Sequence, residues 1–255
     1  MIYTKLMNAH FFETIASLRL LVRRLWGGEK ERRESVAVAA AMFVLAVLYE
    51  LASRQLAPSY AFNIFEFVGT WTGLVCVWLS RTRNILCWPW GIASSLALGV
   101  FFAQINLPGQ EWLNAGYFTV VQLWAWPYWA FGGHTQTELP VSGLSVRGWC
   151  ATIVSVIVGT AVVYEMIGVF APGSLYPFFD SLVVAASVTA QFLLGKKKVE
   201  SWYLWLGPVN LVSMGLFFAA GAYTLTALYV AYFVHALFAV LSWRRVLAVE
   251  AAGRN

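Results

Sequence analysis

Eight long apolar stretches constrain the fold of this chain more than any other feature of its sequence. They lie near residues 36–57, 62–80, 84–104, 111–131, 147–170, 178–195, 202–220 and 224–243. At about 1.5 Å per residue, helices of such length cross a hydrocarbon core of roughly 30 Å. The pattern therefore predicts an all-α integral membrane protein with eight transmembrane helices.

The composition agrees with lipid as the main solvent of the folded chain. Hydrophobic residues make up 60% of it and charged residues only 11%, against roughly 45–50% and about 25% in soluble domains. The 13 Trp and 11 Tyr suit membrane interfaces and polar cavities. The three cysteines have neither metal nor redox spacing and suit small buried hydrophobic positions. We expect no metal site, no cofactor and no catalytic residue in this chain.

Basic residues follow the parity of the apolar stretches. Counted alternately, the connections on one side hold Lys5, Arg19, Arg23, Arg24, Lys30, Arg32, Arg33, Arg81, Arg83, Arg147, Lys196, Lys197, Lys198, Arg244, Arg245 and Arg254. The other side receives only Arg54. The positive-inside rule then predicts a multi-pass protein with both termini in the cytoplasm. This placement also accounts for the net charge of +5 without a nucleic-acid partner.

The first 35 residues are predicted to remain on the cytoplasmic side. They lack the apolar core and cleavage site of a secretory signal, so we expect this segment to be retained. Within 10–26, apolar residues at helical spacing lie beside arginines, which predicts an amphipathic helix on the membrane surface. The first apolar stretch, 36–57, then forms an extra transmembrane helix.

An internal repeat relates two parts of the chain. The letters GVFFA at 99–103 recur as GLFFA at 215–219, a shift of 116 that also aligns Gly91 with Gly207. With a small gap, Glu66 and Asp180 open the preceding stretch in each copy.

Each copy holds three predicted spans, at 62–131 and 178–243, and one linker span, 147–170, separates them. This even offset makes the copies parallel, a 3+1+3 arrangement that is typical of transporters with a substrate site near the midplane.

Polar and aromatic residues inside the spans are the candidates for substrate binding. Because a polar group facing lipid is costly, such residues usually face the helical bundle. Amides beside aromatic rings suit a ligand with a flat ring and hydroxyl groups. The candidates are Trp88, Gln122, Trp126, Asp180, Gln191, Trp202, Trp205, Asn210, Phe217, Tyr232 and His235.

Structural roles compete with binding at several of these positions. Gln122 and Asn210 fit interhelical hydrogen bonds as well as ligand contacts, and Asp180 fits a cap or an ion pair with Glu66. The small residues Gly91, Ser95 and Gly99 share one face of a predicted helix, a pattern typical of close packing between helices. A lone histidine such as His235 is more often structural than a proton switch.

The second repeat resembles the PnuC family of vitamin transporters. The resemblance rests on Asp180, Ala190–Gln191, the basic turn, Glu200-Ser201-Trp202, Trp205 and Asn210. Trp88-Pro89-Trp90-Gly91 and Trp126-x-x-Trp129 are similar in the first half, so that the resemblance covers about 62 to 245.

The resemblance implies a SWEET-like fold and transport of nicotinamide riboside, with thiamine or riboflavin carried by sister branches. It further implies facilitated diffusion in the bacterial inner membrane, trapping by cytoplasmic phosphorylation, and a homotrimer. In this reading Trp126, Trp202 and Trp205 stack on or gate the substrate. The family often has Tyr and then Lys after the late Asn, where this chain has Phe217 and Ala220, so the vitamin stays open.

Other function classes fit less well. An intramembrane enzyme needs a nucleophile–base pair or a metal set, and neither HExxH nor GxSxG occurs. A retinal photoreceptor needs a lysine in the last span, and 224–243 has none. An ion-coupled symporter or a channel remains an alternative, because Glu66 and Asp180 supply carboxylates.

Overall fold

The structure is a computed structural model that describes residues 17–56, 62–104, 111–134, 137–170, 176–219 and 223–252. Nearly all of these residues are helical, and the chain divides into two compact units, Met1–Leu139 and Pro140–Asn255. Residues 10–16 of the predicted amphipathic helix, like Ala220, lie outside the described residues, whereas residues 17–26 form a helix, here called the N-terminal helix.

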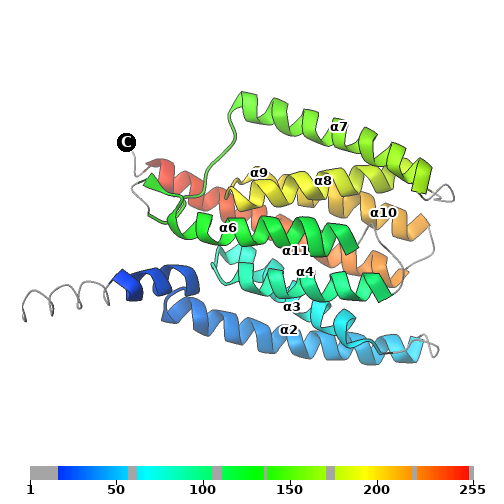
Figure 1. Cartoon of the computed structure of the whole chain (residues 1–255), viewed down its shortest axis with the longest axis horizontal. Helices are drawn as coiled ribbons and strands as arrows, with labels where there is room; N and C mark the ends of the chain where they lie inside the picture. The colour runs from blue at the N-terminus through cyan, green and yellow to red at the C-terminus, as the bar shows by residue number, and fades with distance from the viewer. Residues whose placement is uncertain are drawn as a thin grey trace, which may run out of the picture. The chain divides into compact units, whose positions relative to one another are not determined.

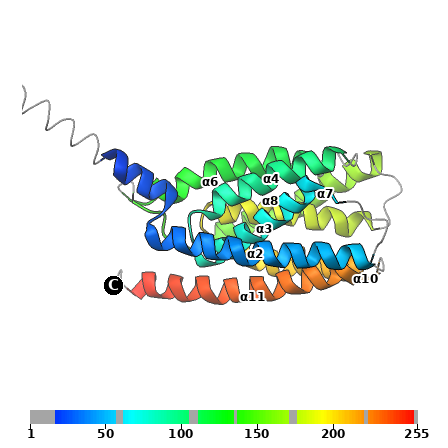
Figure 2. The same ribbon diagram turned by 90° about the horizontal axis from the view of Figure 1, so that it is seen from below.

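The first unit continues from the N-terminal helix through a series of helices (Figures 1 and 2). They are α2 (Glu29–Leu56), α3 (Ile64–Thr82), α4 (Cys87–Gln104), the π-helix η1 (Trp112–Phe118) and α6 (Thr119–Phe131). Helix α3 packs on α2 and α4, and α4 packs on η1 and α6. In Figure 2, α2, α3 and α4 run alongside one another.

The second unit begins with a long helix that packs on its neighbour in sequence (Figure 1). Its elements are α7 (Val146–Phe170), α8 (Pro177–Gly195), α9 (Glu200–Leu204), the π-helix η3 (Trp205–Leu211), α10 (Val212–Ala219) and α11 (Tyr223–Ala252). The predicted linker span thus corresponds to α7, which packs against α8.

Four helical stretches of the described chain are long and apolar enough to cross a bilayer. They are Ser17–Ala52, Val146–Phe170, Pro177–Gly195 and Tyr229–Glu250. Large apolar side chains are exposed along them; Ile157 of α7, for example, is 62% exposed. An apolar surface of this extent indicates contact with lipid.

Turns of the same geometry follow α3 and α8. Arg83 and Lys197, 114 positions apart, are the two non-glycine residues with positive φ among those described, at 62° and 54°. In both turns the next amide donates to a leucine carbonyl five residues back, from Asn84 to Leu79 and from Lys198 to Leu193. The described turns therefore align at a shift of 114 rather than 116.

The π-helices η1 and η3 coincide with the places where the shift between similar residues changes. Gly215 follows η3 and matches Gly99 at a shift of 116. Trp129 follows η1 and matches Trp243 at a shift of 114 again. A π-helix accommodates extra residues without breaking a helix. Pro208 lies within η3, and its missing N–H removes one α-helical hydrogen bond there.

Polar contacts in the first half of α2 join it to α3, α4 and the turn between them. The indole N–H of Trp71 donates to the Ala39 carbonyl at 2.9 Å, and that of Trp90 donates to Ser35 Oγ at 2.8 Å. The Asn84 amide donates to the Glu31 carbonyl at 2.8 Å. Because each bond satisfies a polar group within an apolar bundle, the set holds α2 in one register.

Candidate functional site

A polar cluster lies inside the first unit, between α4 and α6. The side-chain amide of Gln122 donates to Ser95 Oγ at 2.9 Å, and Gln122 is only 4% exposed. Its Oε1 is buried without a hydrogen-bond partner among the described residues. A Cβ on Gly91 would overlap this oxygen and lie 2.8 Å from Cys76 Sγ. Glycine at 91 therefore makes room for the glutamine amide.

Each unit holds a pair of buried tryptophans, and the two pairs are 114 positions apart in the sequence. Trp88 and Trp129 meet edge to face with ring centroids 4.9 Å apart, and Trp202 meets Trp243 at 5.8 Å. The indole N–H groups of Trp88 and Trp202 are buried without an acceptor among the described residues. Since a buried donor without a partner is costly, these two groups are candidates for bonds to water or substrate.

The N-terminal helix holds the predicted site residue Trp126. The indole N–H of Trp126 donates to the Leu25 carbonyl at 2.7 Å, and its ring meets Trp26 edge to face at 5.1 Å. The Arg24 guanidinium lies 5.6 Å from the centre of the Phe131 ring. Trp126 is thus tied to a segment 101 residues away in the sequence.

In the second unit, the structure brings Trp202 and His235 together. The ring centroids of Trp202, in α9, and His235, in α11, lie 6.2 Å apart. The Trp202 ring also contacts that of Trp243. Tyr232 lies on the same helix as His235 and meets Tyr229 edge to face at 5.7 Å. Helix α11 thus takes part in two separate sets of aromatic contacts, one with Trp202 and one between its own tyrosines.

The remaining predicted residues differ in their burial. Gln191 of α8 and Asn210 of η3 are 7% and 5% exposed, and Trp205 is half-buried. Asp180 is exposed in the first turn of α8. Phe217 belongs to α10, but its side chain lies outside the described residues.

A clamp that the sequence did not reveal joins the segment before α7 to the turn before α9. The Ser142 amide donates to the Lys197 carbonyl at 3.2 Å, and the Val199 amide donates to the Ser142 carbonyl at 3.1 Å. Lys198 Nζ donates to Ser142 Oγ at 2.9 Å, and Glu200 Oε1 accepts from the Leu144 amide at 2.8 Å. The basic turn is therefore structural as well as charged.

We expect Glu200→Ala to loosen this clamp. Glu200 is 7% exposed, and the half-buried Leu144 amide loses its bond to a charged acceptor, which is worth about 1.5–3 kcal/mol. Amide hydrogen exchange at Leu144 should accelerate at least tenfold, while Glu200→Gln, which keeps an acceptor oxygen, changes it little. Glu165→Ala removes an exposed carboxylate of α7 and is the matched control. Equal exchange in all three variants would contradict the role of Glu200.

The arrangement suits binding without covalent chemistry. Buried amides and indole N–H groups can bond polar atoms, and aromatic faces can stack on a ring. In the described part of the chain, no group of three or more His, Cys, Asp or Glu side chains is placed to hold a metal ion. Apolar exposed helices together with buried polar side chains define the class as an all-helical membrane protein with polar positions inside its bundles.

Comparisons with known proteins extend this assignment. A family described as nicotinamide mononucleotide transporter matches residues 63–245. A protein of Escherichia coli (strain K12), the nicotinamide riboside transporter PnuC, is 25% identical over 198 residues, 68% of this chain and 82% of that protein. A Neisseria mucosa protein of the same name is 26% identical over 187 residues, 69% of this chain and 70% of that protein.

A solved structure supports the same fold. The crystal structure of the vitamin B3 transporter PnuC superposes with a TM-score of 0.61 at 23% identity, over 91% of this chain and 98% of that one. Since the family match spans most of the sequence, this chain belongs to the nicotinamide mononucleotide transporter family, the PnuC family. It is an integral membrane transporter and not an enzyme.

Proposed function

We propose that this chain transports nicotinamide riboside across its membrane. The observation that carries the proposal is the family match over residues 63–245, together with relatives named nicotinamide riboside transporters. Every substrate-binding residue predicted from the sequence lies within that range.

The side chains within each unit fit the chemistry of this substrate. Nicotinamide riboside has a flat cationic ring, a carboxamide and a ribose with hydroxyl groups. Gln122, Gln191 and Asn210 would bond the carboxamide and the hydroxyls, while Trp126, Trp202 and Trp205 (the proposed stacking residues) would contact the ring. Stacking on a positively charged ring adds a cation–π attraction.

The architecture belongs to the same proposal. Eight spans would cross the bacterial inner membrane as one extra helix and a 3+1+3 SWEET-like core, with both termini cytoplasmic. Charge parity along the sequence supports this topology, and the equivalent turns at Arg83 and Lys197 support the repeat. Alternating access by rocking of the repeats gives facilitated diffusion, trapped by cytoplasmic phosphorylation. A homotrimer is the proposed assembly.

Uptake into proteoliposomes tests the substrate. Purified protein should carry radiolabelled nicotinamide riboside into vesicles until the inner and outer concentrations are equal, and excess unlabelled riboside should abolish the signal. Thiamine and riboflavin are the competing substrates to measure. Uptake of either without the riboside would keep the transporter class and move the substrate, with Phe217 and Ala220 as the positions to examine first.

The same vesicles separate uniport from ion coupling. Because the substrate carries a positive charge, these measurements are made with the membrane potential held at zero. Uniport then predicts that proton and sodium ionophores leave the initial rate unchanged and that neither a proton nor a sodium gradient drives accumulation above equality. Accumulation that collapses with an ionophore would favour the symporter, and Asp180→Asn would then be the first variant to measure.

A further inference from the structure

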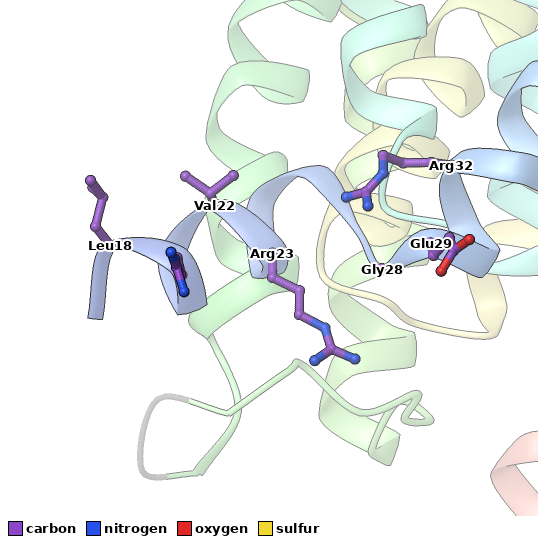
Figure 3. A pocket seen from close by; sticks show the side chains of 7 residues that line it. Leu18, Val22, Arg23, Gly28, Glu29 and Arg32 are labelled. Carbon is purple, nitrogen blue, oxygen red and sulfur yellow. The ribbon is translucent and has the colours of Figure 1, made fainter. Parts of the chain in front are cut away.

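A basic pocket lies where the N-terminal helix meets the start of α2 (Figure 3). Its volume is about 530 Å³, and it is lined by Leu18, Arg19, Val22, Arg23, Gly28, Glu29 and Arg32. Leu18, Val22 and Arg23 come from the N-terminal helix, whereas Glu29 and Arg32 come from α2 (Figure 3). None of these residues belongs to the range that the transporter family matches.

The turn between the two helices lets arginines of both helices line one pocket. Gly27 has φ of 69°, and the guanidinium of Arg32 donates to its carbonyl at 2.9 Å. That bond uses one of the five N–H groups of Arg32. The lining carries three arginines and one glutamate, a formal charge of +2, and Glu29 is paired with Arg33 on the next turn.

The apolar part of the pocket distinguishes between kinds of anion. Leu18 and Val22 are 59% and 46% exposed, and Trp26 on the same helix is 47% exposed. A helix with exposed apolar residues beside arginines lies at a membrane surface, where the arginine heads reach the phosphate layer. A free phosphate would leave these apolar walls in water, whereas a lipid covers them with its glycerol and acyl chains.

We propose that this pocket binds the phosphate of an anionic phospholipid. The guanidinium groups of Arg19, Arg23 and Arg32 hold the phosphate oxygens, and Leu18 and Val22 contact the lipid beneath the headgroup. The positive end of the α2 dipole adds to the attraction. Anionic lipids of the cytoplasmic leaflet supply this ligand on the side where charge parity puts the segment.

Native mass spectrometry of the detergent-purified full chain tests the site with phosphatidylglycerol as the probe. Each basic residue near an anionic membrane surface contributes about 1 kcal/mol, so removing two should weaken binding about thirtyfold. We expect this loss for Arg19→Gln with Arg23→Gln, and a smaller loss for each substitution alone. Lys30→Gln with Arg147→Gln removes the same charge from exposed positions outside the pocket and should leave binding unchanged.

Three results would overturn the proposal. If the control pair weakened phosphatidylglycerol binding equally, the effect would come from the net charge of the protein and not from the pocket. Equal retention of zwitterionic phosphatidylcholine would exclude recognition of the anionic headgroup. If glycerol 3-phosphate or inorganic phosphate saturated the pocket at the same concentration as phosphatidylglycerol, the ligand would be a free phosphate and not a lipid. The readout is lipid binding, so it stands or falls independently of which vitamin is transported.

Discussion

Gly99→Val should destabilise the protein by about 3 kcal/mol or more, whereas Gly215→Val should cost far less. A Cβ on Gly99 would lie 2.6 Å from the Cβ of Ala115 and 3.2 Å from its backbone nitrogen. Because the backbone of η1 cannot move aside as a side chain can, α4 and η1 must separate to admit the new side chain. Overpacking typically costs about 1–3 kcal/mol, and valine adds two methyl groups beyond the Cβ.

Gly215 is the control that the repeat itself supplies. It occupies the matching place in the second copy of the five-letter motif, yet nothing lies within 4 Å of its added Cβ. Thermal unfolding in detergent, followed by tryptophan fluorescence, should show a lower midpoint for Gly99→Val alone. Gly99→Ala should fall between the two. Equal midpoints for the variants at both glycines would show that α4 and η1 do not pack as closely as these distances require.

The fold class could be predicted from the sequence because its signals are local. Apolar length and the alternation of basic residues depend on no long-range contact, and the chain is an all-helical membrane protein. The small residues of the α4 face were expected to form a packing seam, and the structure confirms this at Gly99 against Ala115. Small side chains allow close approach whatever the partner is.

The π-helices could not be predicted in this way. An apolar segment with helical spacing has the same pattern whether its bonds are α or π, and one proline is tolerated within a membrane helix. The five-letter motif therefore gives a single shift of 116, whereas the turns at Arg83 and Lys197 align at a shift of 114. Only the hydrogen bonds of the folded chain expose this difference.

The candidate residues were found as polar groups in apolar stretches, but their partners depend on tertiary contacts. Gln122 was compatible with both ligand contact and interhelical bonding, and the structure supplies the bond to Ser95. Trp126 meets Leu25 across 101 residues, and no periodicity encodes such a contact. The clamp at Glu200 was missed because a glutamate at a helix start normally reads as a helix-dipole partner.

Asn210→Ala should weaken the binding of nicotinamide riboside by about 10- to 100-fold. Asn210 is 5% exposed in η3, one of the two π-helices, and such irregular helices are frequent at functional sites. If its amide bonds the carboxamide or ribose, removing it leaves a buried polar group of the substrate without a partner, at about 1–3 kcal/mol. Calorimetry on detergent-purified protein measures the change directly.

Asn114→Ala is the matched control for this experiment. Asn114 is also a buried asparagine in a π-helix, η1, and is 7% exposed, but the sequence pattern did not nominate it for binding. Its loss should lower stability and leave the affinity of the folded protein within about threefold, well under 1 kcal/mol. If Asn210→Ala lowers only the unfolding midpoint, its amide serves helix packing, and the ligand contacts must be sought at Gln191 and Trp205. If both asparagines weaken binding equally, the loss at Asn210 is not specific to the predicted ligand contact.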